Sequence, residues 1–398
     1  MRSNRFVCIQ ILIAVFLVPF IIVGTLQGAE KKEVTIGYAI SMTGRFADGG
    51  LDTERGYQVW LDRISQEGGL LVGDKRLPVK FKSYDDESNP SNCVKLYERL
   101  ITNDKVDLLL SPWGSGNNFA ASAITEKHRY PLVMVSAAAR NIYERGFKYV
   151  FEVSNLPDTH MRTWFHFMKA HKDELKTAAV LYENFLFTVP MNKALCEFIE
   201  EAGVKLLMDE KYPLGGKDFT GLLLKVKALN PDVLFVLNIM PASIYVTRQA
   251  NEVGVKPKVF MVNIGPMFQK EFIESLGDLS ENVFEDGFWH RDLKFAGNMA
   301  FALAYEKKYN KECSSNSADA YVSCQILEEA VKKAGSLDRE KIVEILRKEK
   351  FETIRGTFEY DESGINKIQR DFICQVQNGK RVIVWPEELS GAKPVFNR

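Results

Sequence analysis

The pattern of hydrophobic and polar residues alternates along most of the chain between two periods. Short runs that are continuously apolar or rich in β-branched residues, such as VTIGYAI at 34–40, predict buried strands. Longer runs between them have helical spacing: in the segment 53–69, Tyr57, Trp60 and Ile64 share one face before two glycines end the pattern. This strand–helix alternation predicts an α/β fold, with parallel sheets covered by helices on both faces.

The alternation occurs twice, so the chain is predicted to contain two doubly wound units in series. The predicted strands of the first unit are 34–40, 77–86, 106–111 and 130–137, and its predicted helices are 53–69, 89–104 and an alanine-rich helix after 111–117. In the second unit the predicted strands are 177–184, 204–212, 231–239 and 258–263, and the predicted helices are 161–175, 189–203, 218–230 and 243–254. Two helices at 301–310 and 317–335 follow, and the alternating segments 356–364 and 370–385, with an Asn378-Gly379 turn, predict a β-ribbon.

Length and composition indicate an ordinary globular protein with more than one domain. Of the 398 residues, 46% are apolar and 26% are charged, and this length suits two domains better than one. The 52 Lys and Arg residues balance the 52 Asp and Glu residues. This balance argues against a nucleic-acid partner, because proteins that bind nucleic acid usually carry a basic excess.

The N-terminal segment 1–29 has the layout of a secretory signal peptide. A basic start is followed by an apolar run at 6–23 and then by small and polar residues. Cys8 lies inside the run, away from the expected cleavage point, so a lipoprotein anchor is not indicated. The length of the run leaves a retained membrane anchor open as an alternative. No other window approaches the roughly 20 apolar residues of a spanning helix, so we expect an exported and otherwise soluble protein.

The positions of cysteine and histidine predict no metal site. Beyond Cys8 there are five cysteines, an odd number, so at least one is unpaired in a monomer. Cys313 and Cys324 are close enough in sequence for a local disulfide in an oxidising compartment, and the alternative is that all five are small buried residues. No Cys/His spacing suggests zinc, and the five histidines are scattered, which is typical of surface or packing positions.

Candidate binding residues lie where the predicted strands end. Ligands of open α/β sheets bind beyond the carboxyl ends of the strands, and with two such units the natural site is between them. The predicted strand-end loops are 41–48, 85–88, 111–117, 136–140, 183–188, 238–241 and 263–267.

Catalytic interpretations of these loops lack the necessary partners. None contains the G-x-G-x-x-G or G-x-x-x-x-G-K-[ST] spacing of a nucleotide site, or a G-x-S-x-G elbow. Ser115 lies between glycines, but no strand-end loop offers a histidine to activate it, so no catalytic residue is predicted. The acidic cluster 85–87 is interpreted as a cap of the next helix, with a metal site or an acid–base pair as the lesser alternative.

Two loops remain as candidates for holding an anion, 111–117 and 136–140. The first combines hydroxyl, amide and backbone N–H donors at the start of a helix, a recipe for anion binding. Ordinary helix capping by Ser115 or Asn117 is an alternative that is compatible with this role. Trp113 is an apolar wall of the site if the cleft exists, and a core residue if it does not.

Several motifs occur along the chain in a fixed order: VTIGYAISMTGRFADGG, GYQVWLDRISQEGGL, YDDESNP, SPWGSGNNFAAS, YPLVMVSAAA, ERGFKYVF, DFTGLLLKVKALNPDVLFV and RQANEVG. Each motif is weak alone. In this order and spacing, from about Val34 to Trp385, they resemble the type I periplasmic solute-binding proteins of branched-chain amino acid ABC transporters, the leucine/isoleucine/valine-binding-protein-like family. The resemblance implies two doubly wound parallel-sheet lobes joined by three interlobe crossovers. The implied lobes are 30–154 plus about 290–352 at the N-terminus, and 155–289 plus about 353–398 at the C-terminus.

The resemblance also implies a binding site. In that family the ligand carboxylate meets hydroxyl and backbone N–H groups of the loop matching 115–117 and of the segment matching 136–139. Loops that match 45–49, 185–188 and 238–241 line the ligand side chain. The implied ligand-binding residues are Phe46, Trp113, Ser115, Gly116, Asn117, Ser136, Ala137, Ala138, Phe187, Met240 and Ile264.

A departure from the family pattern leaves the solute open. Amino-acid binders of the family pair the ligand ammonium with a carboxylate in a loop whose matching position here is 264–265, and 262–267 contains no acid. Because a buried unpaired ammonium is costly, either another acid serves or the solute lacks an ammonium. An apolar or aromatic carboxylate or amide is therefore an equal rival of an amino acid. The family's usual early disulfide also lacks an evident partner for Cys93. The acids that remain as substitutes are Asp48, Glu183 and Asp319.

The sequence therefore predicts an exported, periplasmic substrate-binding protein of an ABC importer that captures a small solute by hinged closure of two lobes. Its expected partners are the solute and a membrane permease, and we expect a monomer with no nucleic acid, metal, cofactor or enzymatic activity. A sensory binding protein that reports to a membrane receptor is the alternative. An enzyme that uses Ser115 or the acids at 85–86 is a weaker one.

Overall fold

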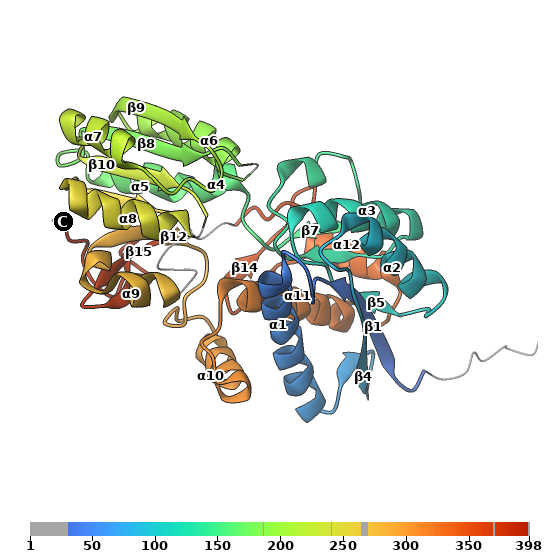
Figure 1. Ribbon diagram of the computed structural model, residues 1–398. Helices are drawn as coiled ribbons and strands as arrows, with labels where there is room; N and C mark the ends of the chain where they lie inside the picture. Colours follow the sequence, from blue (N-terminus) through green and yellow to red (C-terminus); the bar gives the residue numbers. More distant parts are fainter. Residues whose placement is uncertain (1–30, 186, 240, 264–269, 369–370, 397–398) are drawn as a thin grey trace, which may run out of the picture. The chain divides into compact units, whose positions relative to one another are not determined.

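The strands of the first unit form where the sequence predicts buried apolar runs. In this computed structural model, residues 31–185, 187–239, 241–263, 270–368 and 371–396 are described (Figure 1). Strand β1 lies between β4 and β5, with both neighbours parallel to it; β6 and β7 form a second parallel pair, and β2 and β3 an antiparallel one. In chain order the elements are β1 (Val34–Ile40), α1 (Ala47–Gln66), β2 (Leu70–Val72), β3 (Lys75–Leu77), β4 (Val79–Asp85), α2 (Pro90–Thr102), β5 (Leu108–Leu109), α3 (Ser115–His128), β6 (Leu132–Met134), η1 (Arg140–Ile142) and β7 (Val150–Glu152).

A later part of the chain returns to this unit. Its elements are α10 (Asn298–Tyr309), α11 (Ser315–Ala334), α12 (Arg339–Lys348), β13 (Phe351–Thr353) and β14 (Gly356–Phe358). Helix α12 was not predicted from the sequence, although Asp338 caps it by accepting a hydrogen bond from the Lys341 N–H at 3.1 Å.

Helices cover both faces of the first unit because successive strand residues point to opposite sides. Tyr38 and Ile40 of β1 pack in one hydrophobic core with α1 and α11, whereas Ala39 belongs to another core with α2 and α3. Helices α1 and α11, distant in sequence, lie side by side (Figure 1). Their close approach depends on Gly56, since a Cβ there would lie 2.2 Å from the Ser317 carbonyl oxygen.

The hairpin of β13 and β14 bears on the expected lobe boundary near residue 353. Ile354, Phe358 and Tyr360 pack in the same core as β1, and β14 pairs with β13 rather than with the later ribbon. The physical reason is that this hairpin buries its apolar side chains against α11. The chain stays with the first unit further still, because Ile365 packs against the core with α2 and α3 and the Asn366 N–H donates to Glu152 of β7 at 2.9 Å. We therefore propose that the chain leaves the first lobe only after Asn366.

The second unit is built on a seven-stranded sheet in the order β16-β15-β12-β11-β10-β8-β9. Strands β8 to β12 are mutually parallel, and β15 and β16 join at the β12 edge as antiparallel strands. The elements are α4 (Pro157–His160), α5 (Arg162–Ala170), β8 (Thr177–Glu183), α6 (Thr188–Glu201), β9 (Lys205–Tyr212), α7 (Thr220–Leu229), β10 (Val233–Leu237), α8 (Ala242–Val253), β11 (Val259–Val262), α9 (Lys270–Leu276), η2 (Gly277–Ser280), β12 (Val283–Gly287), β15 (Phe372–Gln377) and β16 (Lys380–Trp385).

Both faces of this sheet are also covered. Phe235 of β10 packs in a core with α5 and α6, whereas its neighbours Leu234 and Val236 pack with α7, α8 and α9. This is why VLFVL is apolar without interruption, as strands buried on both faces are. The predicted turn at Asn378 and Gly379 is confirmed, with positive φ angles of 54° and 67° that suit the two-residue hairpin between β15 and β16.

The predicted leader 1–29 lies outside the described residues. Within the described part of the chain, no helix combines the length and hydropathy needed to cross a membrane. The cysteines from Cys93 onward are free, so Cys313 and Cys324 do not form the disulfide that the sequence left open. Four of the five are buried, and Cys196 is half-buried. Burial raises the pKa of the Cys324 and Cys374 thiols well above the usual value, so these are inert packing residues.

Candidate functional site

The carboxylates that end β4 brace neighbouring loops. Asp85 accepts hydrogen bonds from the Met42 N–H at 2.9 Å and from the Thr43 hydroxyl at 2.6 Å. Asp86 is fully buried and accepts the Ser41 hydroxyl at 2.7 Å. Burial raises the pKa of the Asp86 carboxyl, and these hydrogen bonds act against that rise.

The prediction that this acidic cluster caps the next helix is wrong. Helix α2 is capped by Asn89, whose side chain accepts the Ser91 N–H at 2.8 Å. The acids at 85–86 instead point back toward the loop that follows β1, which fixes that loop against β4.

Asn117 belongs to the same bracing network. Its side chain is 2% exposed and donates to Asp86 at 2.9 Å. The Nδ2 group is therefore committed to the protein, whereas the buried Oδ1 has no partner among the described residues. For an anionic ligand, only the backbone N–H of Asn117 remains as a donor, and its contact with a ligand stays a prediction. Its position in the first turn of α3, facing the β4 loop, explains the bond to Asp86.

The first turn of α3 presents backbone donors that have no acceptor among the described residues. Gly114 occupies the N-cap position with a φ of 86° and supplies no side-chain cap. The first intrahelical bond is made by the Asn118 N–H to Gly114 at 3.0 Å. Within the described part of the chain, the N–H groups of Ser115, Gly116 and Asn117 have no acceptor. Neither Ser115 nor Asn117 caps the helix, and its dipole favours an anion here.

An aromatic wall stands beside these donors. The rings of Phe46 and Trp113 lie 5.3 Å apart between centroids at an angle of 47°, and the Arg45 guanidinium lies 4.4 Å from the Phe46 ring. Gly49 packs directly on the indole, since a Cβ there would lie 2.3 Å from the ring. Trp113 is only partly buried, so it remains accessible as a wall.

Asn316, at the start of α11, fixes this wall and a second predicted loop. Its Oδ1 accepts hydrogen bonds from the Trp113 indole at 3.3 Å and from the Ser136 hydroxyl at 3.2 Å. Ser136 has a positive φ of 51°, an uncommon conformation for serine, and its N–H donates to Ser154 at 2.7 Å. Sequence reasoning missed Asn316 because its partners are 203 and 180 residues away and no local motif marks it.

The remaining residues of the 136–139 segment differ in access. Ala137 is fully buried in the core with α3, and its carbonyl oxygen accepts the Tyr143 hydroxyl at 3.0 Å. Ala137 is therefore removed from the set of predicted ligand contacts. Ala138 is half-buried beside Ser136 and stays a prediction.

In the second unit, the strand-end acid Glu183 is occupied by the protein. Its side chain is buried, and its two oxygens accept the N–H groups of Gly215 at 2.7 Å and Ile239 at 3.2 Å. It therefore braces the loops that follow β9 and β10.

The three acids that could pair with a ligand ammonium differ in whether the protein already binds them. Glu183 is used as described, and Asp319 is paired with Arg355 at 2.5 Å. Asp48 is exposed in the first turn of α1, with no partner among the described residues.

The last three predicted contacts come from the sequence of the second unit. Phe187 is half-buried at the start of α6 and packs against the core formed by α5 and α6. Met240 and Ile264 lie outside the described residues and remain predictions.

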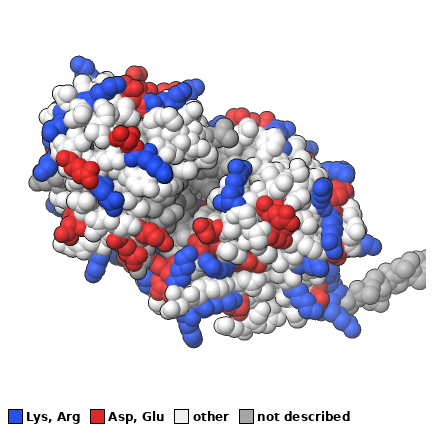
Figure 2. Space-filling view, viewed as in Figure 1, with Lys and Arg blue, Asp and Glu red and all other residues white. Residues whose placement is uncertain are grey.

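The histidines were expected at surface or packing positions, and His160 is buried, with 4% exposure. It forms an ion pair with Asp286, and its pKa is about 9; burial acts to lower this pKa, and the attraction of Asp286 outweighs that effect. No cluster of potential metal ligands occurs among the described residues. On the face seen in Figure 2, acidic and basic side chains are interspersed.

Comparison with known proteins places this geometry in context. Residues 33–381 match the model of a family described as periplasmic binding protein. Leu/Ile/Val-binding protein homolog 7 of Brucella suis biovar 1 is 25% identical over 394 residues, covering 93% of this chain and 96% of the relative.

Two solved structures show the same fold. The branched-chain amino acid transporter substrate-binding protein LivJ from Streptococcus pneumoniae, in complex with isoleucine, is similar with a TM-score of 0.73 and 22% identity, over 92% of this chain and 100% of that one. An ABC-transporter solute-binding protein from R. palustris, in complex with benzoate, has a TM-score of 0.71 and 19% identity, over 91% and 99%.

Proposed function

This chain belongs to the periplasmic binding protein family, and from that premise we propose that it captures a small organic carboxylate between its two lobes. The family and the similar proteins are solute-binding proteins of ABC transporters rather than enzymes. In the proposed cycle the lobes close on the solute by bending at the crossovers and deliver it to a membrane permease. Export by the leader 1–29 to the periplasm, and a monomeric state, are parts of the same proposal.

The observation that carries the proposal is the pairing of unused donors with an aromatic wall. A carboxylate placed at the start of α3 accepts the N–H groups of 115–117, and each hydrogen bond to a charged acceptor contributes about 1.5–3 kcal/mol. Phe46 and Trp113 then provide the apolar surface for the rest of the solute.

Because two of the candidate acids are already bonded within the protein, a solute without an ammonium group is favoured. Glu183 and Asp319 are already satisfied by protein donors, and the loop 262–267 contains no acid. An apolar or aromatic carboxylate therefore leaves no buried charge unpaired.

An amino acid is the second candidate. Asp48 has no partner among the described residues, and the curated relatives carry names of leucine, isoleucine and valine binding. A sensory role, in which the solute-bound protein reports to a membrane receptor, would use the same site. Purification of a complex with either a permease or a receptor domain distinguishes transport from sensing.

Four matched compounds test the proposed function. Calorimetric titration and thermal unfolding are measured with benzoate, benzamide, leucine and leucinamide, so that each carboxylate has a partner lacking that charge. We expect a carboxylate to bind and its amide to bind at least tenfold more weakly. If benzoate binds and leucine does not, the solute lacks an ammonium. The absence of stabilisation by all four at millimolar concentration contradicts the proposal, because bound ligand raises stability by mass action.

A further inference from the structure

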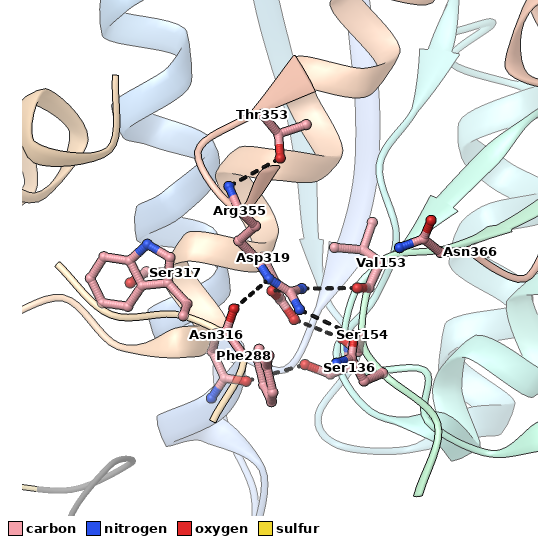
Figure 3. Close-up of polar contacts among 12 residues, drawn as sticks. Ser136, Val153, Ser154, Phe288, Asn316, Ser317, Asp319, Thr353, Arg355 and Asn366 are labelled. Carbon is pink, nitrogen blue, oxygen red and sulfur yellow. Dashed lines mark hydrogen bonds and ion pairs between the residues drawn. The ribbon is translucent and has the colours of Figure 1, made fainter. Parts of the chain in front are cut away.

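A buried arginine joins the places where the chain passes between its two units. These crossovers follow β7, follow β12 and precede β15. The Arg355 guanidinium donates to the Val153 carbonyl at 2.9 Å and to the Asn155 side chain at 3.2 Å, both on the first crossover. It also donates to the Phe288 carbonyl at 3.1 Å, on the second (Figure 3). With 7% exposure, Arg355 makes these bonds away from water, where they are strong.

The Arg355 network of hydrogen bonds reaches the third crossover through Asn155. The amide of Asn155 accepts from Arg355 and donates to Asp371, which lies just before β15. A guanidinium presents five donors in a fixed planar fork, so it can bind several acceptors at once. Lysine offers three donors on one flexible point charge and cannot reproduce this geometry.

A continuous chain of hydrogen bonds leads from Arg355 back to the aromatic wall. Arg355 donates to Asp319 of α11 at 2.5 Å, and the other oxygen of Asp319 accepts the Ser154 hydroxyl at 2.8 Å. Ser154 in turn accepts the Ser136 N–H, and the Ser136 hydroxyl donates to Asn316, as does the Trp113 indole. Figure 3 shows Ser136, Ser154, Asp319 and Arg355 in sequence along this path.

This chain of hydrogen bonds stabilises an unfavourable backbone conformation at Ser136. A non-glycine residue in the left-handed region costs about 1–3 kcal/mol and persists only where its surroundings over-determine it. Both hydrogen-bond donors of Ser136 are held, the N–H by Ser154 and the hydroxyl by Asn316. Loss of the Ser154 anchor would free Ser136 to relax, and Asn316 and Trp113 would then lose their shared geometry.

We propose that Arg355 is a positioning residue of the binding site: it ties the crossovers together and, through Asp319 and Ser154, holds Ser136 and Trp113 in place. The inference rests on the proposed function for the role of the wall, but the placement of Trp113 is measurable without any solute. Bending at the crossovers therefore moves the same hydrogen-bond network that sets the wall.

The test follows the indole N–H signals of the five tryptophans by ¹H–¹⁵N NMR, in protein without added solute. The Trp113→Phe variant assigns the Trp113 signal. The variants are Arg355→Lys and Ser154→Ala, with Ser154→Thr as the conservative rescue. Arg347→Met is the matched control, because Arg347 also donates to backbone carbonyls, at Glu362 and Lys148, without contacting Asp319.

We expect the Trp113 signal to move in Arg355→Lys and in Ser154→Ala, to return in Ser154→Thr, and to stay in place in Arg347→Met. The Trp164 signal, which reports a hydrogen bond to Asp286 in the second unit, should stay in Ser154→Ala. An unmoved Trp113 signal in Ser154→Ala overturns the proposal even if Arg355→Lys does not fold. An equal movement in Arg347→Met also overturns it. Failure of all four solutes to bind contradicts the proposed function alone, since the NMR result does not depend on them.

Discussion

The strand ends of the two units differ in whether their backbone donors are already satisfied. In the first unit, the N–H groups that open α3 have no acceptor in the described part of the chain. In the second unit, Glu183 accepts the N–H groups of Gly215 and Ile239, so the loops after β9 and β10 are closed onto a buried carboxylate. Among the described residues, the first unit leaves backbone donors at a helix start without acceptors, and the second uses the donors of two loops to hold those loops together.

The difference assigns distinct roles under the proposed function. An anionic solute gains most by meeting the first unit, where its charge replaces an absent acceptor at a helix start. The second unit then contributes shape and apolar surface rather than charge, because Glu183 is already bonded and Phe187 is anchored on its core. Substitutions in either unit test this difference between the two.

The largest effect is expected for Glu183→Ala. It removes the buried carboxylate that accepts the N–H groups of the exposed Gly215 and the half-buried Ile239. Hydrogen bonds to a charged acceptor contribute about 1.5–3 kcal/mol each, so the free energy of unfolding should fall by about 3–6 kcal/mol in urea titrations. The control is Glu210→Ala, which removes an exposed ion pair with Lys225 and should cost less than about 1 kcal/mol. Equal losses in the two variants would show that Glu183 braces nothing.

The second effect is a dependence of stability on pH, because the second unit also neutralises Asp286 internally. His160 pairs with Asp286 and has a pKa of about 9, against 6.5 for a free histidine. A raised histidine pKa means that this stabilisation is complete below pH 6.5 and is lost as the pH rises through 9; it amounts to about 3 kcal/mol. Asp371, whose pKa burial raises to about 7, adds a loss in the same direction between pH 4 and pH 7.

The measurement is the free energy of unfolding from pH 6 to pH 9.5 in the natural chain and in His160→Gln. We expect the natural chain to lose stability toward alkaline pH and the variant to lose less. His166→Gln is the control, since His166 is exposed. Parallel curves for the natural chain and His160→Gln would show that His160 does not cause the pH dependence of stability.

Local patterns predicted the fold well because the central strands of the two main parallel sheets, such as β1 and β10, are buried on both faces. The run VTIGYAI became β1 without a change of bounds, and Asn89 with Pro90 opens α2 as predicted. The site was harder, because its decisive contacts join distant residues. The sequence marked 111–117 correctly as a donor-rich helix start. Only the structure shows that the Asn117 amide donates to Asp86 and that Asn316 accepts the Trp113 indole N–H.

A third, smaller effect should separate two neighbours within the first unit. Ser115→Ala is expected to weaken binding of the carboxylate found in the solute titrations by roughly 1–3 kcal/mol, with little change in stability without solute. Asn117→Ala should do the reverse: it removes a buried bond to Asp86 and should lower the free energy of unfolding by about 1–3 kcal/mol. Calorimetry and urea titration of both variants measure the crossing pattern. If Asn117→Ala weakens binding with its stability intact, its side chain does face the solute.

The smallest effect is expected for Asp48→Asn, and it decides what the second end of the solute is. If the solute has no ammonium, an exposed carboxylate in the first turn of α1 should affect binding by less than about 0.5 kcal/mol, and its loss should cost stability only about 0.3–1 kcal/mol through the helix dipole. If Asp48 pairs with an ammonium, removal of its charge should weaken leucine binding by about 2–5 kcal/mol and leave benzoate binding unchanged. Asp62→Asn on the same helix, whose ion pair with Lys308 lies on the surface, serves as the control. A loss of affinity confined to leucine would therefore show that Asp48 binds the ligand ammonium, in place of the acid that the loop 262–267 lacks.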